Sequence, residues 1–276
     1  MISAPLEMDK RVFFDSDTYD TPVNDNPSLL ERIRKDNRLY FSLKFAQVTF
    51  SSMFKAKRGV YDDVAWEQSS FFVFNFIERS GGVFHIEGMD NITKVKEPVI
   101  FIANHMSTLE TFILPCLISP RRRVTFAVKD GLVKHPLFKD VMLSRDPIVV
   151  GRVDPRKDLE EVMTKGSELL SKGTSVIIFP QSTRSQTLDP AHFNTIGVKL
   201  AKKAGVQVVP VALKTDFWQN GKLIKELGPI DSKIPIYFKF GEPITVEGNG
   251  KETNHAIFNF IKENVDRWSA PLATTK

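Results

Sequence analysis

The stretch Pro98-Val-Ile-Phe-Ile-Ala-Asn-His-Met-Ser-Thr-Leu-Glu110 organises the fold of this chain. Its apolar run from Val99 to Ala103 predicts a short buried strand. The strand ends at Asn104-His105, where a polar turn leads into a helix that contains Glu110. Because open α/β sheets build their sites at the carboxyl ends of strands, an imidazole with a nearby carboxylate here predicts a catalytic base and its orienting acid.

Length and composition suit one large domain with a sizeable core, since the chain has 276 residues of which 42% are hydrophobic. The single cysteine, Cys116, allows no internal disulfide and favours a reducing compartment. The formal net charge is +5, although residues 1–27 hold six acidic side chains against two basic ones. The rest of the chain therefore carries the positive charge and favours anionic partners. The acidic N-terminus is not typical of a signal peptide, and no run reaches the roughly 18 apolar residues of a membrane span.

Three regions differ in character. Residues 1–27 are acidic and contain three prolines, which predicts a weakly ordered lead-in. Residues 28–80 begin with the capping box Ser28-Leu-Leu-Glu31 and predict two Phe-rich helices, a basic one from Ser28 to Phe54 and a second from Val64 to Ile77. These helices either dock on anionic headgroups or pack on a core with a solvated basic face. Residues 81–276 form the third region.

Strand-like and helix-like segments alternate in this third region. Short apolar runs typical of strands occupy residues 83–87, 99–103, 124–128, 147–150, 175–179, 206–213 and 236–240. Helical spacing occupies residues 107–117, 159–170, 195–204 and 255–268. The alternation predicts an α/β fold with a central, largely parallel or mixed sheet flanked by helices on both faces.

Polar groups follow three of the predicted strands: Asn104-His105 with Glu110, Arg152, and Ser182-Thr183-Arg184. A base together with two arginines suits deprotonation of a hydroxyl on a phosphate-bearing substrate, because guanidinium groups bind phosphate in bidentate geometry. Lys129 ends a further strand and is another candidate for phosphate binding. No spacing of Cys, His and Asp residues suggests a metal site.

Four blocks of the sequence resemble the glycerolipid acyltransferases, the family that includes 1-acylglycerol-3-phosphate acyltransferase. Asn104-His105 and Glu110 match an Asn-His-x-x-x-x-Asp block, and Ile148-Val-Val-Gly-Arg152 resembles a block that ends in Asp-Arg. Phe179-Pro-Gln-Ser-Thr-Arg-Ser185 resembles Phe-Pro-Glu-Gly-Thr-Arg-Ser, and Val209-Pro-Val-Ala-Leu213 resembles Val-Pro-Val-Ala-Ile. The blocks follow the family's order, and the likeness spans roughly residues 88–240.

The resemblance implies transfer of an acyl group from acyl-CoA or acyl carrier protein to the hydroxyl of a lysolipid. The expected acceptor is 1-acylglycerol-3-phosphate, which would give phosphatidic acid, and neither a metal nor a further cofactor is implied. His105 would be the general base, and Glu110 would fix its tautomer. The residues expected to bind substrate are Asn104, Lys129, Arg152, Gln181, Ser182, Thr183 and Arg184.

The sequence departs from the family's pattern at three places. Glu110 and Gly151 each replace an Asp of the pattern, and Gln181-Ser182 replaces its Glu-Gly. Two alternatives therefore remain: an acyltransferase for a different lysolipid, and a catalytically silent lipid-binding protein of the same fold. Ser107-Thr-Leu-Glu110 is also a capping box, so Glu110 has a structural alternative.

Two other function classes are disfavoured. A nucleic-acid-binding module has only the charge and the aromatic residues in its favour, since no recognition signature is present. A hydrolase lacks the Gly-x-Ser-x-Gly elbow. Because a lysolipid acceptor lies in a bilayer, the resemblance favours a peripheral protein that docks at the cytoplasmic face of an anionic membrane through residues 28–80, without a transmembrane span.

Overall fold

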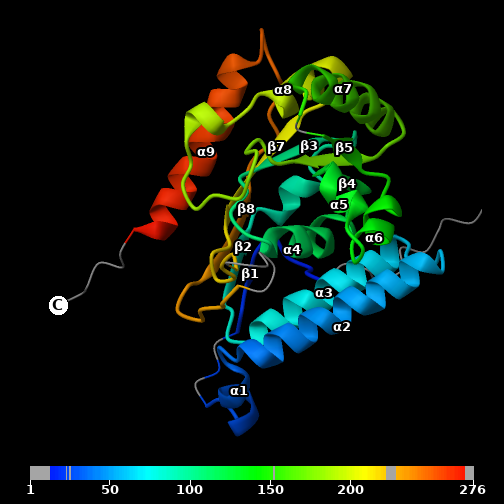
Figure 1. Cartoon of the computed structure of the whole chain (residues 1–276). Helices are drawn as coiled ribbons and strands as arrows, with labels where there is room; N and C mark the ends of the chain where they lie inside the picture. The colour runs from blue at the N-terminus through cyan, green and yellow to red at the C-terminus, as the bar shows by residue number, and fades with distance from the viewer. Residues whose placement is uncertain (1–12, 23, 25, 152, 222–227, 271–276) are drawn as a thin grey trace, which may run out of the picture.

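A mixed eight-stranded sheet forms the centre of the computed structural model, which describes residues 13–270 except 23, 25, 152 and 222–227 (Figure 1). The strands lie in the order β1-β2-β8-β7-β3-β6-β4-β5. Their bounds are β1 (Tyr19–Asp20), β2 (Phe84–Glu87), β3 (Ile100–Ala103), β4 (Val124–Lys129), β5 (Ile148–Val150), β6 (Ser175–Ile178), β7 (Val208–Lys214) and β8 (Ile236–Phe240). Strands β7, β3, β6, β4 and β5 are parallel, whereas β8 runs antiparallel to β7 and β1 antiparallel to β2. The predicted α/β class with a largely parallel or mixed sheet is confirmed.

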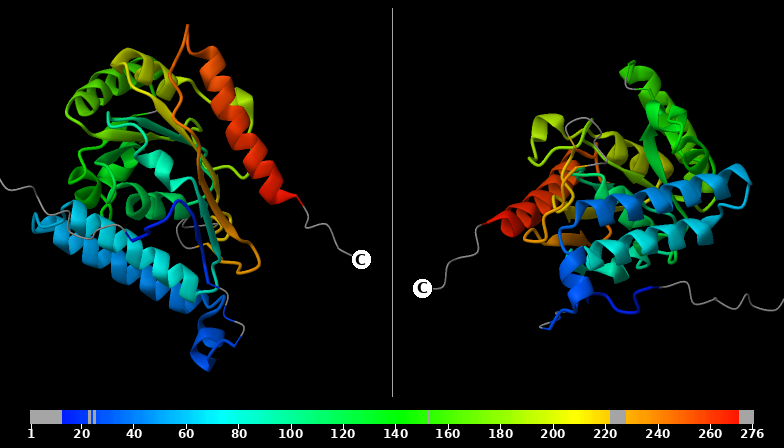
Figure 2. Two further views of the ribbon diagram at one scale, coloured as in Figure 1. Left: turned by 180° about the vertical axis from the view of Figure 1, so that it is seen from behind. Right: turned by 60° about the horizontal axis from the view of Figure 1, so that its bottom comes forward.

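Helices cover both faces of the sheet. On one face lie α2 (Arg38–Lys57), α3 (Asp63–Arg79) and α4 (Leu109–Ile118), and on the other lie α7 (Pro155–Ser171), α8 (Ile196–Ala204) and α9 (Lys251–Ser269). Figure 2 shows the sheet between the α2–α3 pair and α9. The short helices are α1 (Leu29–Arg34), α5 (Asp130–Lys134) and α6 (Lys139–Leu143), with 3-10 turns at Met89–Ile92 and Pro190–His192.

The sequence of strand β3 is apolar throughout because both faces of the strand are buried. Phe101 and Ala103 belong to the core beneath α2, α3 and α4, whereas Ile100 and Ile102 belong to the core beneath α7, α8 and α9. Successive side chains of a strand point to opposite faces, so a strand covered on both sides has no position for a polar residue. The first polar residues after β3 are therefore placed at its carboxyl end.

The helix predicted from Ser28 to Phe54 is divided into α1 and α2. The capping box at Ser28 is present, with Glu31 bonding back to the Ser28 backbone. The division falls at Asp36, whose φ of 54° ends the helical path. The Asp36 carboxylate accepts hydrogen bonds from the backbone and the hydroxyl of Ser232, so a contact distant in sequence stabilises the break.

The described part of the lead-in is packed, which differs from the weakly ordered segment expected for residues 1–27. Phe14 is 5% exposed and its ring contacts Phe74, with the ring centroids 5.0 Å apart. Tyr19–Asp20 pairs with β2, and the Tyr19 hydroxyl donates to Glu78 at 2.8 Å. The acidic composition of residues 1–27 gave no sign that Phe14 and Tyr19 pack against the rest of the protein. The prediction for residues 1–12 lies outside the described residues.

The sequence left two interpretations of residues 28–80, membrane docking and core packing, and the helices of this region differ in which of the two they fit. Phe74, Phe76 and Ile77 of α3 are buried in the core, so the phenylalanines of this helix serve packing. Exposed large apolar side chains remain on α1, on α2 and just after α2; they are Leu29, Leu30, Ile33, Leu39, Leu43, Phe50, Phe54 and Val60. Among the described residues, none of the helices combines the length and the apolar character that crossing a membrane requires.

Candidate active site

His105 and Glu110 face each other across the turn between β3 and α4. The Nδ1 atom of His105 lies 2.9 Å from Oε1 of Glu110. The imidazole also stacks on Phe179, with the ring centroids 4.4 Å apart, and this contact fixes the plane of the ring. With Nδ1 held by a carboxylate, the proton resides there and Nε2 carries the lone pair that accepts a proton from a substrate.

Glu110 is fully buried and combines the two roles that the sequence left open. Its Oε1 atom accepts the backbone N–H groups of Met106 and Ser107 at 2.7 and 2.9 Å, which secures the start of α4. Its Oε2 atom accepts the Thr215 hydroxyl at 2.6 Å. Burial acts to raise the pKa of Glu110, but the hydrogen bond and charge of His105, with the bond from Thr215, outweigh burial and leave the pKa lowered. The carboxylate is therefore ionised at neutral pH.

Asn104 does not fit the expected role in substrate binding. Its side chain is 1% exposed, and its amide pairs with the backbone of Leu213 on β7, donating to the carbonyl and accepting from the N–H, both at 2.8 Å. Both ends of the amide are thus used inside the protein. We correct the expectation: Asn104 ties the end of β3 to β7 and so holds the turn that carries His105.

Gln181 also makes a hydrogen bond inside the protein, through its side-chain oxygen. The side chain is 4% exposed, and its Oε1 atom accepts the backbone N–H of His105 at 2.6 Å. It therefore braces the His105 turn from the segment that follows β6. A carbonyl oxygen is what this contact needs, so a glutamine serves here without placing a charge in the buried turn.

The remaining predicted residues of the described chain come together at one cavity of about 530 Å³. The cavity is lined by His105, Lys129, Ser182, Thr183 and Arg184. Lys129 is the last residue of β4, and the others follow β3 and β6. The parallel order of these strands brings their carboxyl ends to the same edge of the sheet. Arg152 lies outside the described residues, so its place in the site stays a prediction.

The opposite wall of this cavity was not anticipated from the sequence. It comes from α2, α3 and α4 and from the α5–α6 segment, through side chains such as Val48, Trp66, Phe112, Leu132 and Phe138. These side chains give the cavity a largely apolar interior that reaches from His105 to the N-terminal helices. The one sequence feature that could have indicated this wall is the apolar face of α2. An apolar helix face alone predicts packing against a core and does not predict a ligand.

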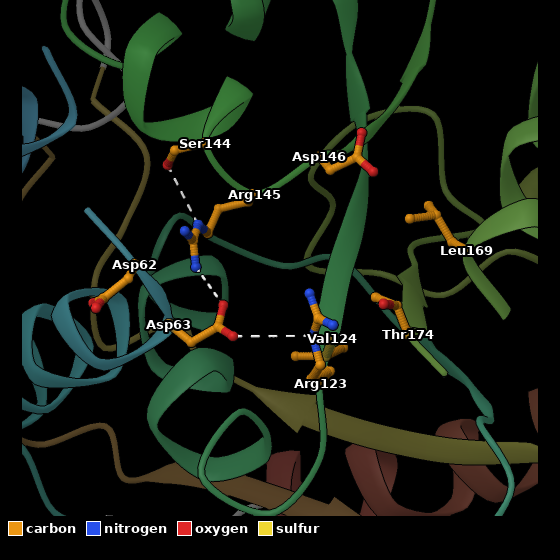
Figure 3. A pocket seen from close by; sticks show the side chains of 9 residues that line it. All are labelled: Asp62, Asp63, Arg123, Val124, Ser144, Arg145, Asp146, Leu169 and Thr174. Carbon is orange, nitrogen blue, oxygen red and sulfur yellow. Dashed lines mark hydrogen bonds and ion pairs between the residues drawn. The ribbon is translucent and has the colours of Figure 1, made fainter. Parts of the chain in front are cut away.

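A smaller cavity of about 280 Å³ lies near the start of α3 and contains none of the predicted site residues (Figure 3). Arg145 donates to Asp63 at 2.6 Å and to the Tyr61 carbonyl at 2.6 Å, and its guanidinium lies over the Trp66 ring. Since Tyr61 and Trp66 also line the larger cavity, Arg145 holds part of that cavity's wall against the sheet.

Comparisons with known proteins show what this chain is similar to. A family profile described as Acyltransferase matches residues 83–214. The 1-acyl-sn-glycerol-3-phosphate acyltransferase of Pseudomonas aeruginosa is 30% identical over 168 residues, which cover 60% of this chain and 61% of that protein. The chloroplastic 1-acyl-sn-glycerol-3-phosphate acyltransferase LPAT1 of Arabidopsis thaliana is 32% identical over 47% of this chain and 35% of its own length. The chain thus spans less than two thirds of either relative.

A solved structure shares the fold. The crystal structure of the 1-acyl-sn-glycerophosphate acyltransferase PlsC from Thermotoga maritima aligns with 88% of this chain and all of that chain, at a TM-score of 0.63 and 21% identity. The profile match and the curated relatives agree with the four sequence blocks, and the chain is therefore similar to the glycerolipid acyltransferases over about half of its length.

Proposed function

We propose that this protein transfers a fatty acyl group from a thioester donor to the hydroxyl of 1-acylglycerol-3-phosphate and forms phosphatidic acid. The observation that carries the proposal is the His105–Glu110 pair at the end of an apolar cavity that also has cationic side chains in its lining. Relatives whose names state this activity support the choice of acceptor. The donor is acyl-CoA or acyl carrier protein.

The reaction follows from the position of the two residues. Nε2 of His105 takes the proton of the acceptor hydroxyl while the oxygen attacks the thioester carbonyl. Ionised Glu110 stabilises the imidazolium that forms. The tetrahedral intermediate then collapses, the carbon–sulfur bond breaks, and His105 returns the proton to the leaving thiolate. Proton transfer of this kind contributes about 10²–10⁴-fold to the rate.

The cavity has a polar part and an apolar part, which suit the phosphate and the acyl chain of the substrates, respectively. Lys129, Thr183 and Arg184 lie with His105 at the strand ends, where a lysolipid phosphate would be bound by cationic and hydroxyl groups. The wall formed by Val48, Phe112 and their neighbours would hold the acyl chain. Arg152 remains a candidate for a second phosphate contact.

We also propose that α1 and α2 dock the protein on an anionic membrane, at its cytoplasmic face. The exposed apolar side chains of these helices lie among basic residues, the combination that interfacial helices use on anionic headgroups. Since α2 also forms a wall of the cavity, docking would bring the cavity close to the lipid that supplies its acceptor. The docking surface is narrower than residues 28–80, because α3 is largely buried.

The direct test incubates purified protein with acyl-CoA or acyl carrier protein and a panel of lysolipids, and detects diacyl product by mass. The expected product is phosphatidic acid, with His105→Ala as the inactive control. Product from a different lysolipid alone would correct the acceptor. If no acceptor gave product with either donor, the proposal would be wrong and a lipid-binding role would remain.

A further inference from the structure

The ring of Phe179 covers one face of the His105 imidazole. The two ring centroids are 4.4 Å apart, and the ring planes differ by only 20°. Phe179 follows β6 and His105 follows β3, and these two strands are neighbours in the sheet. The side chain of His105 is 14% exposed. The contact therefore lies largely out of water, at the residue that the proposed reaction uses as its base.

The orientation of the two rings decides what the contact can do. An aromatic ring carries partial negative charge on its faces and partial positive charge on its edge, so a cation is attracted to a face. Nearly parallel planes place the imidazole over the face of Phe179 and not against its edge. The neutral imidazole gains mainly packing from this contact, whereas an imidazolium also gains an electrostatic attraction.

The protein holds these two rings together through the backbone of His105. The Gln181 side chain accepts the N–H of His105 at 2.6 Å, and the Ser185 N–H donates to the carbonyl of His105 at 2.9 Å. Both partners belong to the segment that begins at Phe179. On β4, Phe126 lies nearly parallel to Phe179, with the centroids 6.1 Å apart and the planes 16° apart. The position of Phe179 is therefore fixed relative to His105.

We propose that Phe179 is a positioning residue that stabilises the imidazolium form of His105 through the π face of its ring. The inference rests on the proposed function, because it takes His105 as the general base. His105 becomes positively charged as it accepts the proton of the hydroxyl, so the contact with Phe179 strengthens toward the transition state. An interaction that strengthens in this way raises kcat. Phe179 thus acts on the face of the imidazole, while Glu110 acts at Nδ1 on its edge.

Fluorine atoms on the Phe179 ring test the electrostatic part of the contact without removing the ring. Phenylalanine with one, two or three fluorine atoms is incorporated at this position, and each fluorine draws electron density from the ring face with little change in shape. Acyl transfer is measured at saturation with the donor and acceptor that give product. We expect kcat to fall stepwise, by about 2- to 30-fold for the trifluoro ring, the range that cation–π contacts span. KM should change little, because the contact strengthens only when His105 is charged.

A second measurement does not depend on turnover. An NMR titration follows the protonation of the His105 ring, whose signal is assigned by its absence in His105→Gln. The pH at which half of the rings are protonated should fall by about 0.4–1.5 units when Phe179 carries three fluorine atoms. Glu110 contacts the same ring, and Lys129 and Arg184 line the same cavity. These groups are identical in every variant, so the difference between variants reports the ring contact.

Two further variants separate charge from packing. Phe84 on β2 is fully buried and stacks on Phe74, with the centroids 4.1 Å apart and the planes 17° apart. Three fluorine atoms on Phe84 are the matched control, because this ring stacks on another phenylalanine and not on an imidazole. This control should keep both kcat and the titration of His105. Phe179→Leu removes the aromatic face but keeps an apolar side chain, and its kcat should fall at least as far as that of the trifluoro variant.

The outcomes separate this inference from the proposed function. A lower half-protonation pH across the fluorine series, in a protein that transfers no acyl group, would support the ring contact and contradict the proposed function. Acyl transfer with the same kcat in every fluorine variant would support the proposed function and overturn the inference, even if Phe179→Leu were slow, since the ring would then serve packing alone. A fall in kcat without a change in the half-protonation pH would also overturn it.

Discussion

The Oε1 atom of Glu110 lies 2.9 Å from Nδ1 of His105 and 2.7 Å from the backbone nitrogen of Met106. One carboxylate oxygen thus binds both the His105 ring and the turn that carries it. The orientation of His105 is set by the backbone before any substrate arrives, which is the kind of preorganisation that favours a proton transfer.

Replacing Glu110 with glutamine separates its charge from its structural role. The amide oxygen can take the position of Oε1 and accept the N–H groups of Met106 and Ser107, while the NH₂ group takes the position of Oε2 beside the Ser107 and Thr215 hydroxyls, which can turn to accept from it. The neutral side chain no longer stabilises an imidazolium, so we expect kcat to fall by about 10²–10⁴ while the fold is retained. Steady-state kinetics and circular dichroism measure the two effects. Wild-type kcat in Glu110→Gln would show that His105 acts alone.

The lowered pKa of Glu110 predicts an acid-sensitive contribution to stability. Because its folded pKa lies below the ordinary value of 4.5, the ionised carboxylate stabilises the fold at pH values above 4.5. That contribution is lost as the pH falls through the folded pKa. Urea unfolding of the wild type and of Glu110→Gln should therefore give a difference in unfolding free energy that shrinks in acid. The two proteins differ in no other carboxylate. A difference in unfolding free energy that stays constant with pH would therefore contradict the lowered pKa of Glu110.

Gln181 offers a test of how the His105 turn is held. Gln181→Leu removes the acceptor of the His105 N–H and leaves that group buried and unpaired, which should cost about 1–3 kcal/mol of unfolding free energy and also reduce kcat. Gln181→Glu, which restores the residue typical of the family, keeps an acceptor oxygen and is the matched control. We expect it to retain most of the activity. Equal losses in both variants would indicate that the amide itself is required.

The sequence sufficed for those parts of the site that lie within one local segment. His105 and Glu110 are five residues apart, so a strand, a turn and a helix bring them together whatever the rest of the chain does. The apolar runs likewise predicted the strands and the two-sided burial of β3. The carboxyl ends of parallel strands then brought Lys129 and Arg184 to the same cavity.

The hydrogen bonds by which Asn104 and Gln181 hold the His105 turn could not be predicted from the sequence, because they depend on which strands are neighbours. Asn104 bonds to Leu213 because β7 lies beside β3, and Gln181 reaches His105 because β6 lies on the other side. Polar residues next to a catalytic histidine favour substrate binding as the first interpretation. Only the strand order shows that their hydrogen bonds are used inside the protein.

The exposed apolar side chains of α2 predict where the protein meets a membrane. Leu43 and Phe54 are 61% and 54% exposed, and their replacement by glutamate removes apolar contact and adds repulsion from anionic lipid. We expect each substitution to weaken binding to anionic vesicles about tenfold or more, given the roughly 1.5–3 kcal/mol for burying such a side chain. Flotation with vesicles of phosphatidylglycerol and phosphatidylcholine measures the bound fraction.

The control for this prediction is Val153→Glu. Val153 is 91% exposed and precedes α7, in the helical layer on the opposite face of the sheet from α2. Its replacement adds the same charge to the protein without touching the proposed surface, so vesicle binding should change little. Raised salt should weaken the binding of the wild type, because part of the attraction comes from basic residues near the lipid. Equal losses for Val153→Glu and Leu43→Glu would show that net charge, and not the apolar surface of α2, governs binding.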